Sequence, residues 1–423
     1  SMRLLPGYDL SSEQKKIVVL SSLGGLLEFY DFTIYGLFAV YFAQQFFPSS
    51  NEFIAIIASY SIFVVGYIVR PLGGILFSHI GDEIGRKTVL IITMILMGVS
   101  SLGMGLLPTY AQIGLFAPAL MLLFRLIQGL AIGGELPSMI VYVSESMPHK
   151  RGFGLGGAFS GTVAGLIPGM LINLLIVHWL SVEQINSFGW RIPFLLGGLL
   201  CFIGYLIRRE LHETAEFKKI KQHEAAPFIE VLRHHLGKVI IGVGLVSIMA
   251  TPIILLIIFM PTYLTKLAHI PTKIASDAVL VASVVSVISI YVMGILANKY
   301  SVYKLMRNSL FLILPAAALC YYLIGQGSNL ILGLALFAVF QGFLVVLPTI
   351  VLSYLFPVKI RLTGVALSYN ISFVMFGGLT PIVITSIIAE TTGLVLFVPF
   401  GVLLVTVAFA YWALRRSREY MVE

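Results

Sequence analysis

Long apolar segments, separated by short polar ones, run through almost the whole chain of 423 residues. A helix needs about 20 mostly apolar residues to cross roughly 30 Å of hydrocarbon. Segments of this kind lie at residues 17–46, 53–79, 89–107, 113–146, 153–178, 190–208, 238–264, 274–298, 305–324, 329–355, 363–389 and 393–414. The pattern therefore predicts an all-α integral membrane protein with twelve transmembrane helices.

The composition supports the membrane assignment and limits the possible partners. Hydrophobic residues make up 58% of the chain, charged residues 11%, and the mean hydropathy is +0.99, which is far outside the range of soluble globular proteins. Of the 27 Lys and Arg residues, 22 lie on the side of the predicted helices that carries both termini. Arg70 and Arg125 lie within helices, and Arg191, Lys266 and Lys273 lie on the opposite side. This positive-inside asymmetry predicts a cell membrane protein, in bacteria of the inner membrane, with both termini in the cytoplasm. It gives no sign of a nucleic-acid partner.

The chain divides into two similar halves. The motif Phe-x-x-x-Gln-Gly at residues 124–129 recurs at residues 337–342. The one long polar segment lies between the halves, and its mixture of Lys, Glu, His and apolar residues predicts one or two amphipathic helices on the inner leaflet. We therefore predict an N-terminal six-helix bundle at residues 1–208, a linker at 209–237 and a C-terminal six-helix bundle at 238–423.

The first predicted helix carries acidic residues near its middle. Glu28, Asp31 and Tyr35 are spaced so that they share one helix face. A carboxylate at this depth is costly unless it is paired or faces water, so such residues usually mark a transport pathway. We expect Asp31, with Glu28, to bind and release a proton. The alternative is a permanent ion pair of either residue with Arg125 that locks two helices together.

The fourth predicted helix presents a second polar face. Arg125, Gln128 and Glu135 lie on it at helical spacing. A guanidinium offers a two-pronged donor to a carboxylate, so Arg125 is expected to bind an anionic group of the substrate. Glu135 has two interpretations of equal weight, a second proton site or a hydrogen bond that holds helices together.

Several uncharged polar residues are further candidates for substrate contact, because they can hydrogen-bond a solute without adding charge. Each could instead join two helices. These candidates are Tyr30, Tyr35, Gln128, Tyr263, Gln341, Tyr369 and Asn370.

A charged loop follows the second helix at residues 81–87 and predicts a gate on the cytoplasmic side. Asp82 can lie at the N-terminus of the eleventh helix, where the helix dipole favours an anion. Arg86 would then reach Glu145, whereas ordinary positive-inside charge would explain Arg86 but not Asp82. The other residues expected to take part in gating are Lys87, Arg70 and Arg361.

The second half lacks the charges of the first. Arg125 is matched by Ala338 and Glu135 by Pro348 in the repeat. We therefore expect proton chemistry in the first half, and substrate contacts and movement in the second.

Other chemistry finds no support along the chain. The two cysteines, Cys201 and Cys320, lie in apolar segments without partner spacing and are expected to be inert. No cluster has metal-ligand spacing, and no Gly-x-x-x-x-Gly-Lys-Ser/Thr loop or nucleophile–base arrangement is recognisable. We expect neither an enzyme nor a cofactor other than a coupling proton.

Two motifs carry a family resemblance. Residues 78–87 read Ser-x-x-x-Asp-x-x-Gly-Arg-Lys, and residues 125–129 read Arg-x-x-Gln-Gly. With twelve spans and a central linker, the chain resembles the major facilitator superfamily, although Ser78 stands where Gly is usual. The resemblance implies a secondary transporter whose two halves rock around a central site.

A finer resemblance is to the metabolite:proton symporter branch of that superfamily, which includes carriers of proline and betaine, α-ketoglutarate, citrate and shikimate. It rests on Glu-Phe-Tyr-Asp-Phe at 28–32, Arg-Pro-Leu-Gly-Gly at 70–74, Gly-Gly-Glu at 133–135, Pro-Thr-Tyr-Leu at 261–264 and Arg-Leu-Thr-Gly at 361–364. Together these matches favour proton-coupled uptake of a small polar organic metabolite, a carboxylate or a zwitterion.

Three other functions stay open at this point: a proton-coupled exporter, a carrier of a larger carboxylate such as a siderophore, and a membrane sensor that binds without transport. Exporters of the superfamily have an adjacent Gly-Pro pair in the fifth helix, whereas here Gly165 and Pro168 are separated. The expected partners are the small-molecule substrate and the lipid bilayer, and the expected assembly is a monomer.

Overall fold

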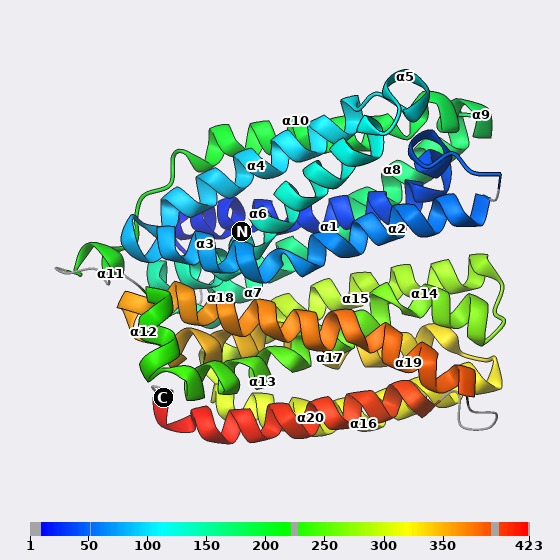
Figure 1. Cartoon of the computed structure of the whole chain (residues 1–423). Coiled ribbons are helices and arrows are strands. Elements are labelled where there is room, and N and C mark those ends of the chain that lie inside the picture. Colours follow the sequence, from blue (N-terminus) through cyan, green and yellow to red (C-terminus); the bar gives the residue numbers. More distant parts are fainter. Residues whose placement is uncertain (1–9, 51, 221–226, 391–396, 422–423) are drawn as a thin grey trace.

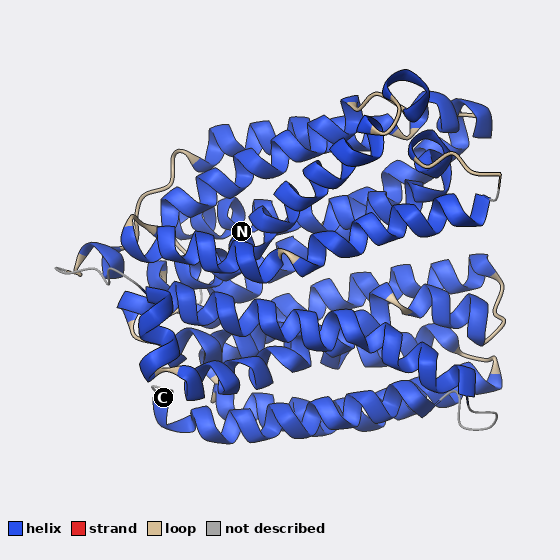
Figure 2. Cartoon of the chain, viewed as in Figure 1, coloured by secondary structure: helices blue, strands red, loops and turns tan. Residues whose placement is uncertain are grey.

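The computed structural model describes residues 10–50, 52–220, 227–390 and 397–421, and every regular element within these ranges is a helix (Figure 2). The N-terminal half contains α1 (Ser12–Phe46), α2 (Glu52–Ile68), α3 (Arg70–Glu83), α4 (Arg86–Leu106), α5 (Tyr110–Ile113), α6 (Phe116–Ser146), α7 (Arg151–Val163), α8 (Leu166–Trp179), α9 (Val182–Gln184), the π-helix η1 (Ile185–Gly189) and α10 (Arg191–Arg208). The prediction of an all-α fold is therefore confirmed.

The linker and the C-terminal half complete the chain. The linker contains α11 (Ala215–Lys218) and α12 (Pro227–His234). The C-terminal half contains α13 (Leu236–Ile253), η2 (Ile254–Ile258), α14 (Met260–Thr262), η3 (Tyr263–Leu267), α15 (Thr272–Lys299), α16 (Val302–Gln326), α17 (Leu330–Leu355), η4 (Val358–Ile360), α18 (Arg361–Ser372), η5 (Phe373–Gly378), α19 (Leu379–Glu390), α20 (Val398–Ser417) and η7 (Arg418–Tyr420).

The two halves lie side by side, with their long helices running in roughly the same direction (Figure 1). The linker helices and the C-terminus lie at one end of the molecule, which we call the linker end (Figure 1). The start of α1 is at the same end, because Ser12 and Glu13 share a pocket with Glu210 and Glu213 of the linker. The opposite end carries the short helices α5 and α9.

Eleven helices in the described ranges are long and apolar enough to cross a membrane. The second predicted span accounts for a twelfth, but it is divided into α2 and α3. The break is explained by Pro71, which has no N–H to donate to the carbonyl of Tyr67 and whose ring crowds that carbonyl. As a result, Arg70 is the first residue of α3 and lies directly at the break.

Two predicted helices of the C-terminal half are also irregular. The seventh span contains the π-helical segments η2 and η3, and the eleventh contains η5. A π-helical turn interrupts the regular α-helical hydrogen bonding, and such turns occur frequently at functional sites. Both η2 and η5 contribute residues to the cavity described below.

In its described part the linker contains two short helices, and their expected place on the inner leaflet stays a prediction. Phe217 of α11 and Val231 of α12 are buried against the protein, while Ile229 and Leu232 are exposed. The helix α11 packs on the end of α6, and α12 packs on α18 and α3. The apolar residues of the linker therefore serve partly to cover the ends of the two halves.

The two halves meet along helices that carry small residues. Helix α7 packs against α15, and α3 packs against α18. A Cβ atom on Gly294 of α15 would lie 2.7 Å from the Cα of Gly156 on α7 and 2.7 Å from the carbonyl oxygen of Gly152. Only glycine permits this backbone approach, which is the small-residue packing common between membrane helices.

We expect Gly294→Val to separate the halves at the linker end, because its side chain would overlap backbone atoms of α7. Spin labels at the exposed residues Glu83 and Lys359, one on each half, would report a longer and broader distance than in the wild type. Gly401→Val is the control, since a Cβ at Gly401 meets nothing within 4 Å. Equal distances in the two variants would contradict the role given to Gly294.

Candidate functional site

Two acid–guanidinium pairs lie in the middle of the N-terminal half. The Oε1 atom of Glu28 is 3.3 Å from Nη2 of Arg70, and the Oδ2 atom of Asp31 is 3.1 Å from Nη1 of Arg125. All four residues are buried. Pairing reduces the cost of burying these charges, so each pair places its helices at a fixed distance.

The first pair lines a small cavity at the boundary between the two halves, which we call the central cavity. Its volume is about 40 Å³, roughly the space of one water molecule. The lining residues are Glu28, Phe29, Phe32, Tyr67, Arg70, Leu136, Ile253, Ile254, Tyr369, Phe373 and Gly377. The cavity thus combines one acidic and one basic group with several aromatic rings.

Aromatic side chains hold the charged pair of the central cavity. The guanidinium carbon of Arg70 lies 3.9 Å from the centre of the Tyr67 ring, a cation–π contact made possible by their spacing across the helix break. From the other half, Tyr369 and Phe373 stack with their ring centres 4.6 Å apart, at the junction of α18 and η5. The helix irregularities of both halves therefore meet at this cavity.

The second pair lies outside the central cavity, within the N-terminal half. Nη1 of Arg125 also donates to Oε1 of Gln128 at 2.5 Å, and the guanidinium carbon lies 4.7 Å from the centre of the Tyr35 ring. A separate small pocket borders Asp31, Gln128 and Tyr30. The group expected to receive an anionic substrate is thus already occupied by Asp31 and Gln128 in this conformation.

Glu135 lies apart from the central cavity and is completely buried. It pairs with Arg208, whose Nη2 and Nη1 atoms lie 2.5 and 3.1 Å from the two carboxylate oxygens. Thr93 donates a further hydrogen bond of 2.5 Å to Glu135. Arg208 also donates to the carbonyls of Leu20, Ser21 and Leu90. The arrangement joins α1, α4, α6 and α10, which favours the helix-packing interpretation of Glu135.

Most of the uncharged candidates for substrate contact join helices in this structure. The Tyr30 hydroxyl donates to the carbonyl of Pro193 at 2.7 Å, and the Tyr35 hydroxyl donates to that of Ser59 at 2.6 Å. The Asn370 amide donates to the Gly133 carbonyl at 2.8 Å, across the boundary between the halves.

The remaining candidates lie in the C-terminal half. Gln341 accepts a hydrogen bond of 2.5 Å from Ser286, and the Tyr263 ring packs 5.7 Å from that of Tyr321. Of the seven uncharged candidates, Tyr369 is the one that lines the central cavity.

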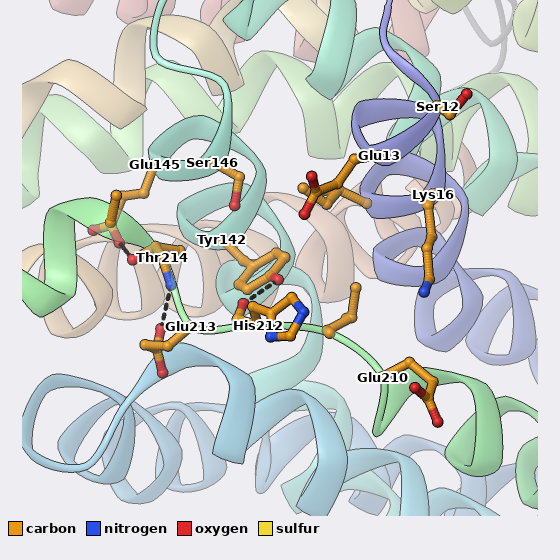
Figure 3. A pocket seen from close by; sticks show the side chains of 13 residues that line it. Ser12, Glu13, Lys16, Tyr142, Glu145, Ser146, Glu210, His212, Glu213 and Thr214 are labelled. Carbon is orange, nitrogen blue, oxygen red and sulfur yellow. Dashed lines mark hydrogen bonds between the residues drawn. The ribbon is translucent and has the colours of Figure 1, made fainter.

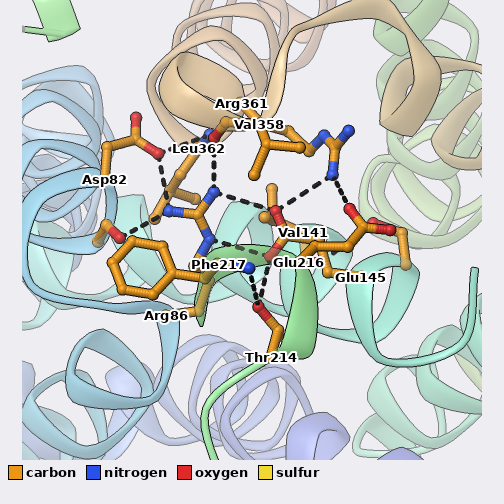
Figure 4. Close-up of polar contacts among 12 residues, drawn as sticks. Asp82, Arg86, Val141, Glu145, Thr214, Glu216, Phe217, Val358, Arg361 and Leu362 are labelled. Atoms are coloured by element: carbon orange, nitrogen blue, oxygen red, sulfur yellow. Dashed lines mark hydrogen bonds and ion pairs between the residues drawn. The ribbon is translucent and has the colours of Figure 1, made fainter. Parts of the chain in front are cut away.

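At the linker end, Asp82 connects the two halves. Its Oδ2 atom accepts hydrogen bonds from the Thr363 amide at 3.0 Å and the Thr363 hydroxyl at 2.7 Å. Its Oδ1 atom accepts one from the Leu362 amide at 3.3 Å (Figure 4). These amides are at the N-terminus of α18, where the partial positive charge of the helix favours a carboxylate. The contact between Asp82 and the eleventh span is therefore present in this conformation.

Arg86 extends the same set of contacts. It donates to the two oxygens of Glu145 at 3.1 and 3.0 Å and to the carbonyl of Val358 in the other half at 2.9 Å (Figure 4). Arg361 approaches Glu145 from the C-terminal half at 3.2 Å. Glu145 therefore receives one guanidinium from each half, which stabilises the closed linker end.

The linker takes part in this set of contacts. The Thr214 hydroxyl donates to Glu145 at 2.7 Å, and Arg361 donates to Glu216 at 2.6 Å (Figure 4). We call the whole set the linker-end network; its members are Asp82, Arg86, Glu145, Thr214, Glu216, Arg361 and Thr363. Any separation of the halves at this end must break it.

A pocket of about 420 Å³ lies beside the network, between the start of α1, the end of α6 and the linker (Figure 3). Tyr142 crosses it to donate a hydrogen bond of 2.5 Å to the carbonyl of His212. Lys87 joins the linker through its main-chain amide, which donates to Glu213 at 3.3 Å. These bonds hold the linker against the N-terminal half.

Some residues of the site were missed from the sequence. Tyr67 lies three positions before Arg70 and Phe373 four positions after Tyr369, so helical spacing from a candidate could have indicated both. Arg208 stands at the end of the sixth predicted helix, where the positive-inside pattern accounts for a basic residue, and nothing local distinguishes it. No sequence pattern indicates the linker residues Thr214 and Glu216 of the network, because their partners Glu145 and Arg361 are far away in the sequence.

Known proteins resemble this chain in sequence. The family model of the Major Facilitator Superfamily matches residues 21–323. The chain is 32% identical over 391 residues to the inner membrane metabolite transport protein YhjE of Escherichia coli, covering 88% of each protein. It is 31% identical over 402 residues to the glycine betaine/proline/ectoine/pipecolic acid transporter OusA of Dickeya dadantii, covering 90% of this chain and 79% of that relative.

Solved structures resemble it in fold. The proton:xylose symporter XylE, bound to 6-bromo-6-deoxy-D-glucose, superposes with a TM-score of 0.79 at 17% identity, over 95% of this chain and 96% of XylE. FucP in the outward conformation gives a TM-score of 0.68 at 15% identity, over 96% of this chain and 98% of FucP. At these identities the likeness concerns the fold alone.

We expect Glu135→Ala to destabilise the protein by about 3 to 5 kcal/mol, because it leaves the guanidinium of Arg208 buried without its carboxylate. Thermal unfolding in detergent would show a lower midpoint, while Glu210→Ala, whose side chain is 62% exposed, would leave the midpoint unchanged. Combining Glu135→Ala with Arg208→Met should restore much of the loss. An unchanged midpoint in the single variant would instead favour the proton-site interpretation.

Proposed function

The chain belongs to the major facilitator superfamily, and from this premise we propose that it imports a small organic carboxylate or zwitterion together with protons. Its relatives and its fold support secondary transport of small solutes. The transport cycle would be alternating access, in which the two halves open in turn at the linker end and at the opposite end.

The observation that carries the proposal is the central cavity. It lies between the two halves and contains Glu28 and Arg70 among aromatic side chains. A carboxylate and a guanidinium side by side can recognise the opposite charges of a zwitterion, and aromatic faces attract a substituted ammonium group. The relative OusA is named for betaine, proline, ectoine and pipecolic acid, each of which carries a carboxylate and a cationic nitrogen.

The proton would be carried by acidic residues near this cavity. Glu28 and Asp31 are the candidates, because each is paired with a single guanidinium and one oxygen of each carboxylate has no hydrogen-bond partner in the described part of the chain. Burial favours the protonated form of a carboxylate and a nearby guanidinium favours the charged form. A helix movement that changes either pair would therefore change its proton affinity.

The linker-end network would act as the inner gate. We propose that the linker end faces the cytoplasm, in agreement with the positive-inside pattern, so that both termini are cytoplasmic. Asp82, Arg86, Glu145 and Arg361 would hold this side closed in the conformation described. Lys87 would contribute by fixing the linker.

The function is tested by uptake into proteoliposomes of labelled dicarboxylates, citrate, shikimate, proline and betaine, with and without an inward proton gradient. We expect at least one member to accumulate only with the gradient. Vesicles that are active and correctly oriented but accumulate none of the panel would contradict the proposal, and would favour export or a larger carboxylate as the cargo.

Asp31→Asn should abolish gradient-driven accumulation and spare exchange of labelled for unlabelled solute. An amide keeps the shape of the side chain but cannot bind and release a proton, and exchange does not need a net proton movement. Uptake and exchange would be measured in the same vesicles, with Asp277→Asn, outside the site, as the matched control. If accumulation in Asp31→Asn equals that of the wild type, Asp31 does not couple protons.

A further inference from the structure

The central cavity contains an acid–base pair that differs from the other buried pairs. Glu28 and Arg70 form the one acid–guanidinium pair, within the described residues, whose two members both line this cavity. The Asp31–Arg125 and Glu135–Arg208 pairs lie within the N-terminal half. A solute bound in this cavity would therefore contact the guanidinium of Arg70 rather than that of Arg125 or Arg208.

The pair is incompletely satisfied. The side chains of Arg70 and Glu28 are 11% and 7% exposed, yet Nε of Arg70 and Oε2 of Glu28 have no hydrogen-bond partner among the described residues. A buried polar atom left without a partner costs about 1 to 3 kcal/mol. Two such atoms in one cavity indicate that the site is built to bind a further polar group.

We propose that the carboxylate of the substrate binds Arg70 in place of Glu28, and that the released Glu28 takes up a proton in the same step. This inference rests on the proposed function and identifies where its two ligands meet. Substrate and proton would thus bind as a linked pair, because each makes the binding of the other more favourable.

Charge balance is the physical reason. With Glu28 ionised, an added carboxylate would leave two negative groups on one guanidinium, an uncompensated charge in a buried site. With Glu28 protonated, the positive Arg70 faces one negative carboxylate, and the net charge of the set is the same as before binding. Binding of one carboxylate is thus balanced by the uptake of one proton on Glu28, and this binding step needs no change of charge at another group.

Among the described residues, Glu28 is the one carboxylate that forms an ion pair with Arg70. The titratable and charged groups around Glu28 are Asp31 on α1, Tyr67 on α2, Arg125 and Glu135 on α6, and Tyr369 on α18. The two acids in this set already hold guanidinium groups of their own, and the tyrosines are neutral at physiological pH. Glu28 is thus the carboxylate that competes with the substrate.

Arg70 suits this role better than Arg125 for a structural reason. Arg125 donates to Asp31 and Gln128 and lies outside the lining of the central cavity. Arg70 stands at the break between α2 and α3 and lines the cavity between the halves. The carboxylate site is therefore assigned to Arg70.

The test is equilibrium binding to the purified full chain between about pH 5 and pH 8. The probes are glycine betaine and shikimate, whose carboxylates stay ionised in this range, and their analogues choline and methyl shikimate, which lack the carboxylate. Binding favours protonated Glu28, so the affinity for a carboxylate should be highest at low pH and fall by up to tenfold per pH unit once Glu28 is ionised. The analogues should not show this loss.

Two variants at the pair should have different effects. Glu28→Gln should bind the carboxylate probe with the low-pH affinity at every pH, because no proton has to be taken up. Arg70→Gln should reduce the affinity for the carboxylate probe to that for its analogue. Should Arg70→Gln fail to fold, Arg70→Lys keeps the charge without the two-pronged donor, and its preference for the carboxylate should be intermediate.

Asp31→Asn and Arg125→Gln are the comparators, because they alter a pair of the same chemistry outside the cavity. Both should keep the pH dependence and the preference for the carboxylate, whatever their effect on transport rate. The inference is overturned if Glu28→Gln keeps the pH dependence of the wild type, or if Arg125→Gln rather than Arg70→Gln loses the preference.

Failure of this inference can be distinguished from failure of the proposed function. Gradient-driven uptake with binding that does not depend on pH supports the function and overturns the inference. If binding depends on pH in the wild type and Glu28→Gln abolishes that dependence, the inference is supported. If the same protein shows no gradient-driven uptake, the proposed function is contradicted. If neither carboxylate probe binds, the inference is overturned, whereas the proposed function is contradicted only when no member of the uptake panel accumulates.

Discussion

The need to pair buried charge controls much of this structure. Each arginine buried in the described ranges contacts a carboxylate or a carbonyl oxygen, because an isolated charge in apolar surroundings is too costly. The contacts are Arg70 with Glu28, Arg86 and Arg361 with Glu145, Arg125 with Asp31, Arg151 with Ser353 and Arg208 with Glu135. The positions of the helices follow from these pairs.

What a buried pair can do depends on where it lies relative to the boundary between the halves. Arg208 and Glu135 belong to one half, so their contact persists when the halves rotate as rigid bodies. Glu145, in contrast, receives a guanidinium from each half, so that movement must break one contact. The same chemistry therefore stabilises a bundle in one place and forms a separable contact in another.

Helix irregularities concentrate where the halves meet at the central cavity. The break before Arg70, the start of η2 at Ile254 and the start of η5 at Phe373 all border it. Regular helices would turn uniform apolar faces to this boundary, whereas breaks and π-helical turns redirect individual side chains and backbone groups. The irregular segments thus create a polar site inside a largely apolar protein.

The sequence by itself determined the helical class, because hydropathy acts locally along the chain. It also singled out Glu28, Asp31, Arg125, Asp82 and Arg86 as charged residues that need a partner, because the cost of burying a charge is local as well. The tertiary structure decided which partner each charge receives. Arg125 and Gln128 share a helix face, but whether Glu28 or Asp31 reaches Arg125, and whether Arg208 turns inward to Glu135, depends on packing between helices distant in sequence. Spacing along one helix places residues on a face, and only the fold brings two faces together.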